Sequence, residues 1–170
     1  MTEHKKLVAL VTGASRGIGA ATASLLARRD YAMQLNLDAQ VRIVDGALPM
    51  MSGGGRIVFV TSHMAHFYAE KGSTGPYEPV AASKYAGEQA LRARRTEFAN
   101  LGIDLVVVSG DMIEGTIMPR LLQRMERGMT EARREQVGSL STIDVFAEAV
   151  ADAASRRDTS NETIFVGKTD

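Results

Sequence analysis

The sequence predicts an α/β fold, a Rossmann-like doubly wound parallel sheet in a three-layer α/β/α arrangement. Apolar, strand-like runs alternate with helix-like segments, and residues 57–60 and 105–108 are apolar throughout, as expected of strands covered on both faces. A chain of 170 residues without a linker-like segment is expected to form a single domain, residues 1–170. The strands are expected at 7–12, 57–61, 104–109 and 163–166, and the helices at 18–29, 38–51, 79–99, 118–127 and 142–155.

The composition argues against several classes of partner. Basic and acidic residues number 20 each, and this balance favours neither a nucleic acid nor a membrane surface as partner. The absence of cysteine excludes a disulfide framework and a thiolate metal site. No stretch approaches the roughly 20 apolar residues of a membrane span. We therefore expect a cytoplasmic protein without a metal.

The first predicted strand runs into a glycine-rich turn, Thr-Gly-Ala-Ser-Arg-Gly-Ile-Gly at residues 12–19. Glycines at these places permit a tight turn, a close approach of the backbone to a phosphate, and close packing of the next helix on the strand. The start of helix 18–29 would then offer free N–H groups to a dinucleotide pyrophosphate. A purely structural turn is the alternative. The candidate cofactor contacts are Gly13, Ser15, Arg16, Gly17, Ile18 and Gly19.

This octapeptide resembles that of the short-chain dehydrogenase/reductase family. Ser62 after strand 57–61, Ala-Ser-Lys at 82–84 and the Ser-Gly…Thr run at 109–116 extend the resemblance. It implies hydride transfer between a nicotinamide cofactor and a carbonyl/alcohol pair, with 3-oxoacyl reductases as an analogy. Arg16 implies NADP(H) rather than NAD(H), because a cation there can meet the 2′-phosphate. Pairing of helices 38–51 and 79–99 into a homodimer or homotetramer is also implied.

The resemblance assigns roles to individual residues. Ser62 would polarise the carbonyl, and Lys84 would hold the nicotinamide ribose and lower the pKa of a catalytic tyrosine. Gly110 and Thr116 belong to the loop that would contact the cofactor. Asn36 fits the family's asparagine, whose backbone carbonyl would hold a water, although a helix N-cap explains it nearly as well. Helix 118–127 would be the substrate lid, and the arginines in and after it, such as Arg133, are typical of a solvated helix face.

The chain departs from the family pattern at the proton donor. The family's tyrosine lies four residues before the lysine, where this sequence has Val80. Tyr77, just ahead of a helix that Pro79 would begin, is the candidate donor, and a packing role is its alternative. His63 and His66 are expected to be polar loop residues, because no third metal ligand accompanies them.

Residues 31–37 allow two interpretations. They could form a second strand, with Asp38 binding the ribose, or they could open helix 38–51. The resemblance favours the helix, because the family's second strand, two further strand–helix units and an Asn-Asn-Ala-Gly turn have no counterpart here. Such a gap would expose edges of strand 7–12. Two alternatives to an enzyme follow, a catalytically inactive NADP(H)-binding protein and an incomplete fragment.

Overall fold

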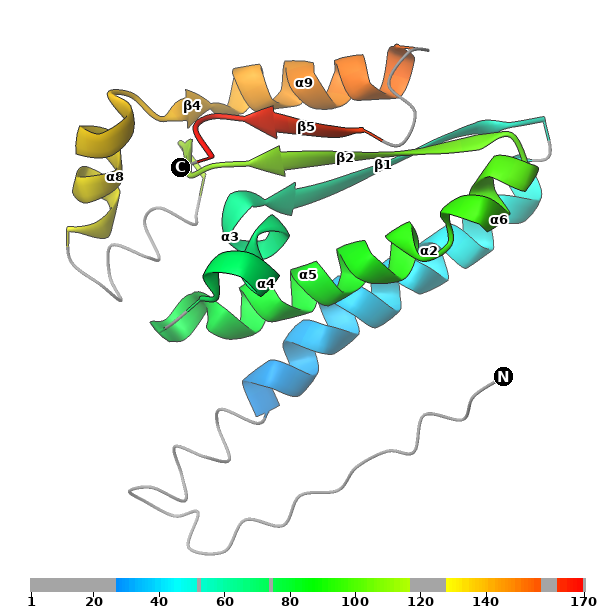
Figure 1. Cartoon of the computed structure of the whole chain (residues 1–170), viewed down its shortest axis with the longest axis horizontal. Helices are drawn as coiled ribbons and strands as arrows, with labels where there is room; N and C mark the ends of the chain where they lie inside the picture. The colour runs from blue at the N-terminus through cyan, green and yellow to red at the C-terminus, as the bar shows by residue number, and fades with distance from the viewer. Residues whose placement is uncertain (1–26, 52, 74, 117–127, 157–161, 170) are drawn as a thin grey trace, which may run out of the picture.

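A three-stranded parallel sheet forms the centre of the computed structural model, which describes residues 27–51, 53–73, 75–116, 128–156 and 162–169. The strands are β1 (Gly55–Ser62), β2 (Ile103–Gly110) and β5 (Thr163–Val166), in the order β1-β2-β5. Helices cover both faces of this sheet (Figure 1). The predicted α/β class and three-layer arrangement are confirmed for these residues. Strand 7–12 lies outside them.

The other elements are mostly helical. The α-helices are α2 (Ala39–Ala47), α3 (His63–His66), α4 (Tyr68–Lys71), α5 (Glu78–Arg92), α6 (Arg95–Asn100), α8 (Met129–Val137) and α9 (Ile143–Ser155). A π-helix, η1 (Gln34–Asp38), precedes α2, and two 3₁₀ turns are η2 (Leu48–Met51) and η3 (Gly75–Tyr77). The short strands β3 (Ile113–Glu114) and β4 (Ser141–Thr142) pair in parallel. No helix in the described ranges combines the length and apolar character needed to cross a bilayer.

Several predicted boundaries differ from the structure. Residues 27–33 are already helical and continue through η1 into α2, so the second-strand interpretation of 31–37 is wrong. Predicted helix 79–99 is two helices, because the backbone leaves helical geometry at Arg94, whose guanidinium pairs with Asp45 and Glu97. Predicted helix 118–127 lies outside the described residues, and α3, α4 and α8 were not predicted.

The central strand β2 shows why an uninterrupted apolar run marks a strand covered on both faces. Leu105 and Val107 point to a core completed by Leu91 of α5 and Phe98 of α6. The alternate residues, Val106 among them, pack on the other face against α9. Because successive side chains of a strand point to opposite faces, both sets are buried.

A buried carboxylate ties α3, α5 and β5 together. Glu88 of α5 is 1% exposed, and its Oε1 accepts from His66 Nδ1 at 2.8 Å and from Arg92 Nε at 2.7 Å. Arg92 Nη2 also donates to Thr163 Oγ1 at 2.6 Å. A buried charge is tolerated when paired in this way. The network anchors α3, the helix that directly follows β1.

Helix α5 packs on η1 at very short range, and Gly87 makes this approach possible. A Cβ atom built at Gly87 would collide with the backbone carbonyl oxygen of Asn36. Beside this contact, Asn36 Nδ2 donates to Ser83 Oγ at 3.0 Å. The two helices are therefore held by a side-chain hydrogen bond and by the absence of a side chain.

Gly87→Ala is expected to lower the free energy of unfolding by about 1–3 kcal/mol, because two helix backbones must separate to admit the methyl group. Urea unfolding of the full chain measures this. Gly46→Ala in α2 is the matched control: a Cβ there meets nothing within 4 Å, so helix propensity should raise stability by about 0.5–1 kcal/mol. Equal effects of the two substitutions would contradict the packing argument.

Candidate active site

A cleft of about 810 Å³ opens beyond the carboxyl ends of β1 and β2. Parallel pairing places Ser62, the last residue of β1, directly opposite Gly110, the last residue of β2. In open α/β sheets ligands bind at this edge. The cleft brings together five residues that the sequence singled out: Ser62, Tyr77, Lys84, Gly110 and Thr116.

Ser62 and Tyr77 share a hydrogen bond of 3.2 Å between Oγ and Oη. Ser62 is both the end of β1 and the N-cap of α3, so its Oγ also accepts from the Ala65 backbone N–H at 3.4 Å. Tyr77 ends the 3₁₀ turn η3 and caps α5, whose first turn contains Pro79. The end of β1 and the turn before α5 are therefore brought together by the fold, and their hydroxyl groups form a hydrogen bond.

Burial raises the pKa of the Tyr77 hydroxyl above its ordinary value of 10.0. The hydrogen bond with Ser62 acts in the opposite direction and is outweighed. Tyr77 is therefore protonated at neutral pH, the state that a proton donor requires. No contribution of Lys84 accompanies these two causes, which differs from the lowering that the resemblance implied.

Lys84 lies on α5 seven residues after Tyr77, which corresponds to two helical turns or about 10 Å along the axis. Because Tyr77 precedes α5 in the turn η3, helix geometry alone does not fix its distance from Lys84. Burial lowers the pKa of the Lys84 ammonium below 10.5. Within the described part of the chain it has no hydrogen-bond or ion-pair partner, and it lines the cleft. A half-buried ammonium that lines the same cleft as Gly110, and that has no partner among the described residues, can donate hydrogen bonds to a ligand with hydroxyl groups.

Asn36 lies behind the cleft and does not line it. It sits inside η1, so the helix N-cap interpretation is wrong. Its side chain bonds Ser83, the neighbour of Lys84 on α5, and its carbonyl oxygen faces Gly87. Asn36 can therefore act on Lys84 only through the packing of α5.

The loop after β2 forms another wall. A Cβ atom at Gly110 would lie 2.5 Å from the ring of Phe146, so glycine lets α9 close over the strand end. The Thr116 hydroxyl donates to the Ile113 carbonyl oxygen at 2.8 Å, which fixes the end of the loop. The six predicted cofactor contacts of the glycine turn, residues 13 and 15–19, lie outside the described residues.

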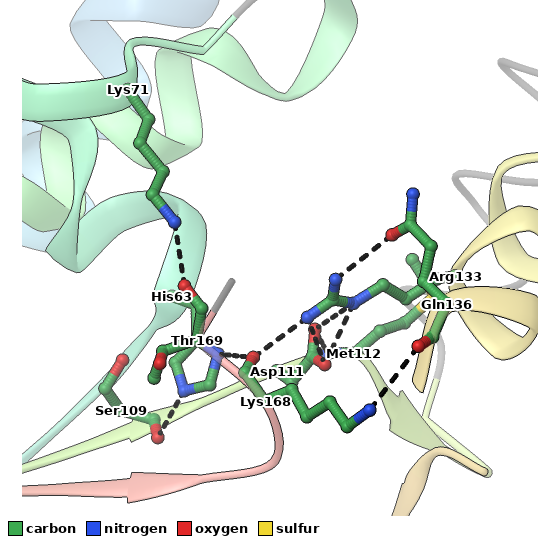
Figure 2. A network of polar contacts seen from close by, with 9 residues as sticks. All are labelled: His63, Lys71, Ser109, Asp111, Met112, Arg133, Gln136, Lys168 and Thr169. Carbon is green, nitrogen blue, oxygen red and sulfur yellow. Dashed lines mark hydrogen bonds and ion pairs between the residues drawn. The ribbon is translucent and has the colours of Figure 1, made fainter. Parts of the chain in front are cut away.

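Several polar residues of the cleft were missed by the sequence analysis. Arg133 of α8, assigned to a solvated face, has a side chain only 18% exposed and pairs with Asp111 through contacts of 2.8–3.1 Å (Figure 2). His63 is buried, and its ring nitrogens lie 2.9 Å from Lys168 O and 3.2 Å from Ser109 O. Asp111 directly follows β2 and Lys168 lies two residues after β5, a signal that the position rule for open sheets could have used.

The histidines do not form a metal site in the described residues, where no group of three potential ligands gathers. Burial lowers the pKa of His63, and the nearby Asp111 opposes this shift. His66 binds Glu88, as described above. Both histidines thus stabilise the fold around α3.

Comparisons with known proteins support the architecture. The family model described as short chain dehydrogenase matches residues 28–127. No match was found among curated proteins. Among solved structures, a gluconate 5-dehydrogenase from Burkholderia cenocepacia, in complex with NADP and tartrate, is 20% identical with a TM-score of 0.67, over 79% of this chain and 52% of that one.

Two further structures are similar in fold. A 3-hydroxyacyl-CoA dehydrogenase type-2 from Mycobacterium avium is 19% identical with a TM-score of 0.61, over 82% of this chain and 55% of that one. A 3-alpha-hydroxysteroid dehydrogenase from a Pseudomonas species, complexed with NADH, is 19% identical with a TM-score of 0.60, over 79% and 63%. The chain thus spans between about half and two thirds of these relatives' length.

Ser62→Ala is expected to raise the pKa of Tyr77 further, because it removes the hydrogen bond that opposes the effect of burial. The measurement is a pH titration of ¹³C-labelled tyrosine by NMR, with Tyr77→Phe assigning the resonance. In the folded wild-type protein this group should titrate above 10, so stability is lost as pH rises through the folded pKa. A Tyr77 pKa that falls in Ser62→Ala would contradict the geometry.

Proposed function

The chain belongs to the short-chain dehydrogenase family, and we propose that it is an NADP(H)-dependent oxidoreductase that interconverts a carbonyl and an alcohol. The hydrogen-bonded pair Ser62 and Tyr77, in one cleft with Lys84, is the observation that carries this proposal. A hydroxyl pair at the carboxyl edge of a parallel sheet is suited to bind a carbonyl oxygen. The 3-oxoacyl reductases remain the functional analogy.

Each side chain has a distinct task in the proposed reaction. When bound, the nicotinamide cofactor supplies the hydride for the carbonyl carbon. Ser62 Oγ donates a hydrogen bond to the carbonyl oxygen and polarises it, and Tyr77 Oη transfers its proton to the same oxygen. With its raised pKa, Tyr77 is protonated at neutral pH, so the proton is in the cleft when the oxygen gains negative charge. Lys84, whose ammonium lacks a partner among the described residues, holds the ribose. Asn36 positions Lys84 through Ser83.

The cofactor assignment draws on three sources. One similar structure holds NADP and another NADH, which supports a nicotinamide cofactor without distinguishing the two. The preference for NADP(H) rests on Arg16, with the glycine turn around it as the proposed pyrophosphate site. Gly110 and Thr116 would line the nicotinamide side of the cleft.

A second candidate is a protein that binds NADP(H) without turnover. It is favoured by Val80, which stands where the family carries its proton donor and has no ionisable group. It predicts cofactor binding that no carbonyl compound converts into NADPH oxidation. The two candidates therefore differ at Tyr77 alone.

Tyr77→Phe is expected to lower the rate of NADPH-dependent carbonyl reduction by a factor of roughly 10²–10⁴, the usual contribution of a general acid. NADPH binding should be retained, because only the hydroxyl is removed and the phenyl ring stays in place. A panel of 3-oxoacyl thioesters and simple ketones, followed by NADPH absorbance, provides the measurement. Tyr85→Phe is the matched control and should keep wild-type rates.

The double variant Tyr77→Phe/Val80→Tyr separates the two candidates further. It restores a donor at the four-residue spacing, so partial recovery of turnover would assign the lost step to proton transfer. Turnover that is equal in wild type and Tyr77→Phe would remove Tyr77 from the mechanism. Cofactor binding with no turnover in any variant would favour the second candidate.

Arg16→Ala is expected to weaken NADPH binding about tenfold and to leave NADH binding nearly unchanged, because only NADPH carries the 2′-phosphate. Fluorescence titration of the full chain with each cofactor measures both affinities. Equal losses for both cofactors would show that Arg16 does not read the phosphate. No binding of either cofactor to the wild-type chain would support the incomplete-fragment alternative.

We also infer assembly into a homodimer or homotetramer through helices 38–51 and 79–99. Its support is the exposure of apolar side chains on the first of these, among them Ile43 at 64% and Met50 at 80%. Light scattering of the purified chain tests this, and a monomer at micromolar concentration would contradict it. The cytoplasmic location stays a prediction from the sequence.

A further inference from the structure

The charges that line the cleft are unbalanced. Among the described residues, four permanently basic side chains line it, those of Lys71, Lys84, Arg133 and Lys168, and one carboxylate, that of Asp111. The chain as a whole is formally neutral, so the excess belongs to this place rather than to the composition. A cleft lined by one sign of charge concentrates ligands of the opposite sign.

The guanidinium of Arg133 already binds other groups of the protein. Its Nε and Nη2 atoms donate to Asp111, its Nη2 also donates to the Lys168 carbonyl oxygen at 2.8 Å, and its Nη1 donates to Gln136 at 3.2 Å (Figure 2). The charge of Asp111 is thereby matched by Arg133. Arg133 acts as a positioning residue that holds α8 against the segment after β5.

Lys71 and Lys168 are not neutralised in this way. Lys71 Nζ donates to the Thr169 carbonyl oxygen at 2.7 Å, and Lys168 Nζ donates to the Gln136 carbonyl oxygen at 3.5 Å. Neither ammonium pairs with a carboxylate in the described part of the chain. Because an ammonium group has three N–H donors, each lysine keeps two for a ligand.

The two lysines belong to different elements that the fold brings to one end of the cleft. Lys71 ends α4, where its ammonium also lies 4.9 Å from the centre of the Phe67 ring. Lys168 follows β5, and Arg133 holds its backbone. Figure 2 shows both in one network of polar contacts at the carboxyl ends of β2 and β5. The two ammonium groups point to different partners, Lys71 to the Thr169 carbonyl oxygen and Lys168 to the Gln136 carbonyl oxygen, and both line the cleft.

We propose that the cleft takes a substrate with an anionic group, a carboxylate or a phosphate, which Lys71 or Lys168 binds while the substrate carbonyl lies beside Ser62 and Tyr77. The inference rests on the proposed function, because it names the substrate class of the same cleft. A lysine ammonium is a point charge that suits both kinds of anion, so the negative charge is the shared chemistry. Lys84 is left out of this pair because its proposed partner is the cofactor.

Matched ketones test the charge requirement directly. We would measure binding to the full chain by saturation-transfer NMR for 4-oxopentanoate and its methyl ester, and for dihydroxyacetone phosphate and dihydroxyacetone. Within each pair the carbonyl is the same and the anion is present or absent. The expected result is at least tenfold tighter binding of one anionic ketone than of its neutral partner. The pair with the larger ratio distinguishes carboxylate from phosphate.

The variant Lys71→Gln/Lys168→Gln should abolish most of the preference for the anionic ketone. Its affinity for that ketone should fall roughly tenfold, the loss in binding free energy expected for partly exposed charge pairs. The affinity for the neutral ketone should change by less than about twofold, because this ketone carries no charge for the lysines to bind. Arg42→Gln, on the exposed side of α2 and outside the cleft, removes a positive charge as a control and should change neither value.

Equal binding of the charged and the neutral ketone by the wild-type chain would overturn the proposal. So would a double variant that weakens binding of both ketones by the same factor. Weakening by Arg42→Gln as large as that by the double variant would overturn it as well. A loss of NADPH affinity without a change in ketone preference would assign the lysines to the cofactor instead and also overturn it. The binding readout needs no turnover. Tighter binding of the anionic ketone without hydride transfer would contradict the proposed function and leave this inference standing. Equal turnover of anionic and neutral ketones would contradict this inference and leave the proposed function standing.

Discussion

Parallel pairing of β1 with β2, in register from Gly55 opposite Ile103 to Ser62 opposite Gly110, brings two strand ends to one level. The β2–β5 ladder ends at the same level, with Gly110 opposite Val166. Ser62, Asp111 and Lys168 line one cleft because of this alignment, since the residues at and after each strand end emerge at the same edge. A shift of the register by one residue would turn the side chains of a strand to the other face and remove Ser62 from the site.

Helix α5 supplies the second wall, and its position depends on contacts on its far side. Gly87 lets the helix approach η1, and Ser83 receives the hydrogen bond of Asn36 there. Glu88, on the same helix, holds α3 through His66. These contacts lie away from the ligand, yet they determine where the cleft-facing residues of α5 stand. Packing behind the helix is thus part of the construction of the site.

Periodicity and apolar runs were sufficient to predict the three strands of the central sheet and the longer helices α2, α5 and α9, but not the short helices α3 and α4 or α8. Leu105 to Val108 are apolar on both faces of β2 because helices cover both, and this signal is local. Ser62 could be found because it directly follows a buried strand. The role of Arg133 could not be predicted, because its partner Asp111 lies 22 residues away. A sequence pattern of arginines and glutamates does not distinguish a solvent-exposed arginine from one in an ion pair. At the α5–α6 break, Arg94 pairs with Asp45, which lies 49 residues away.

The position of Tyr77 has a consequence for how such a site can change. In a helix with four-residue spacing, the distance between the phenol and the lysine is set by helix geometry. Here Tyr77 ends a 3₁₀ turn, and the preceding Gly75 adopts a positive φ of 71°. The loop before α5 therefore sets the reach of the phenol, while the helix sets the place of Lys84. Changes in loop length could retune one group for a larger or smaller substrate without disturbing the other.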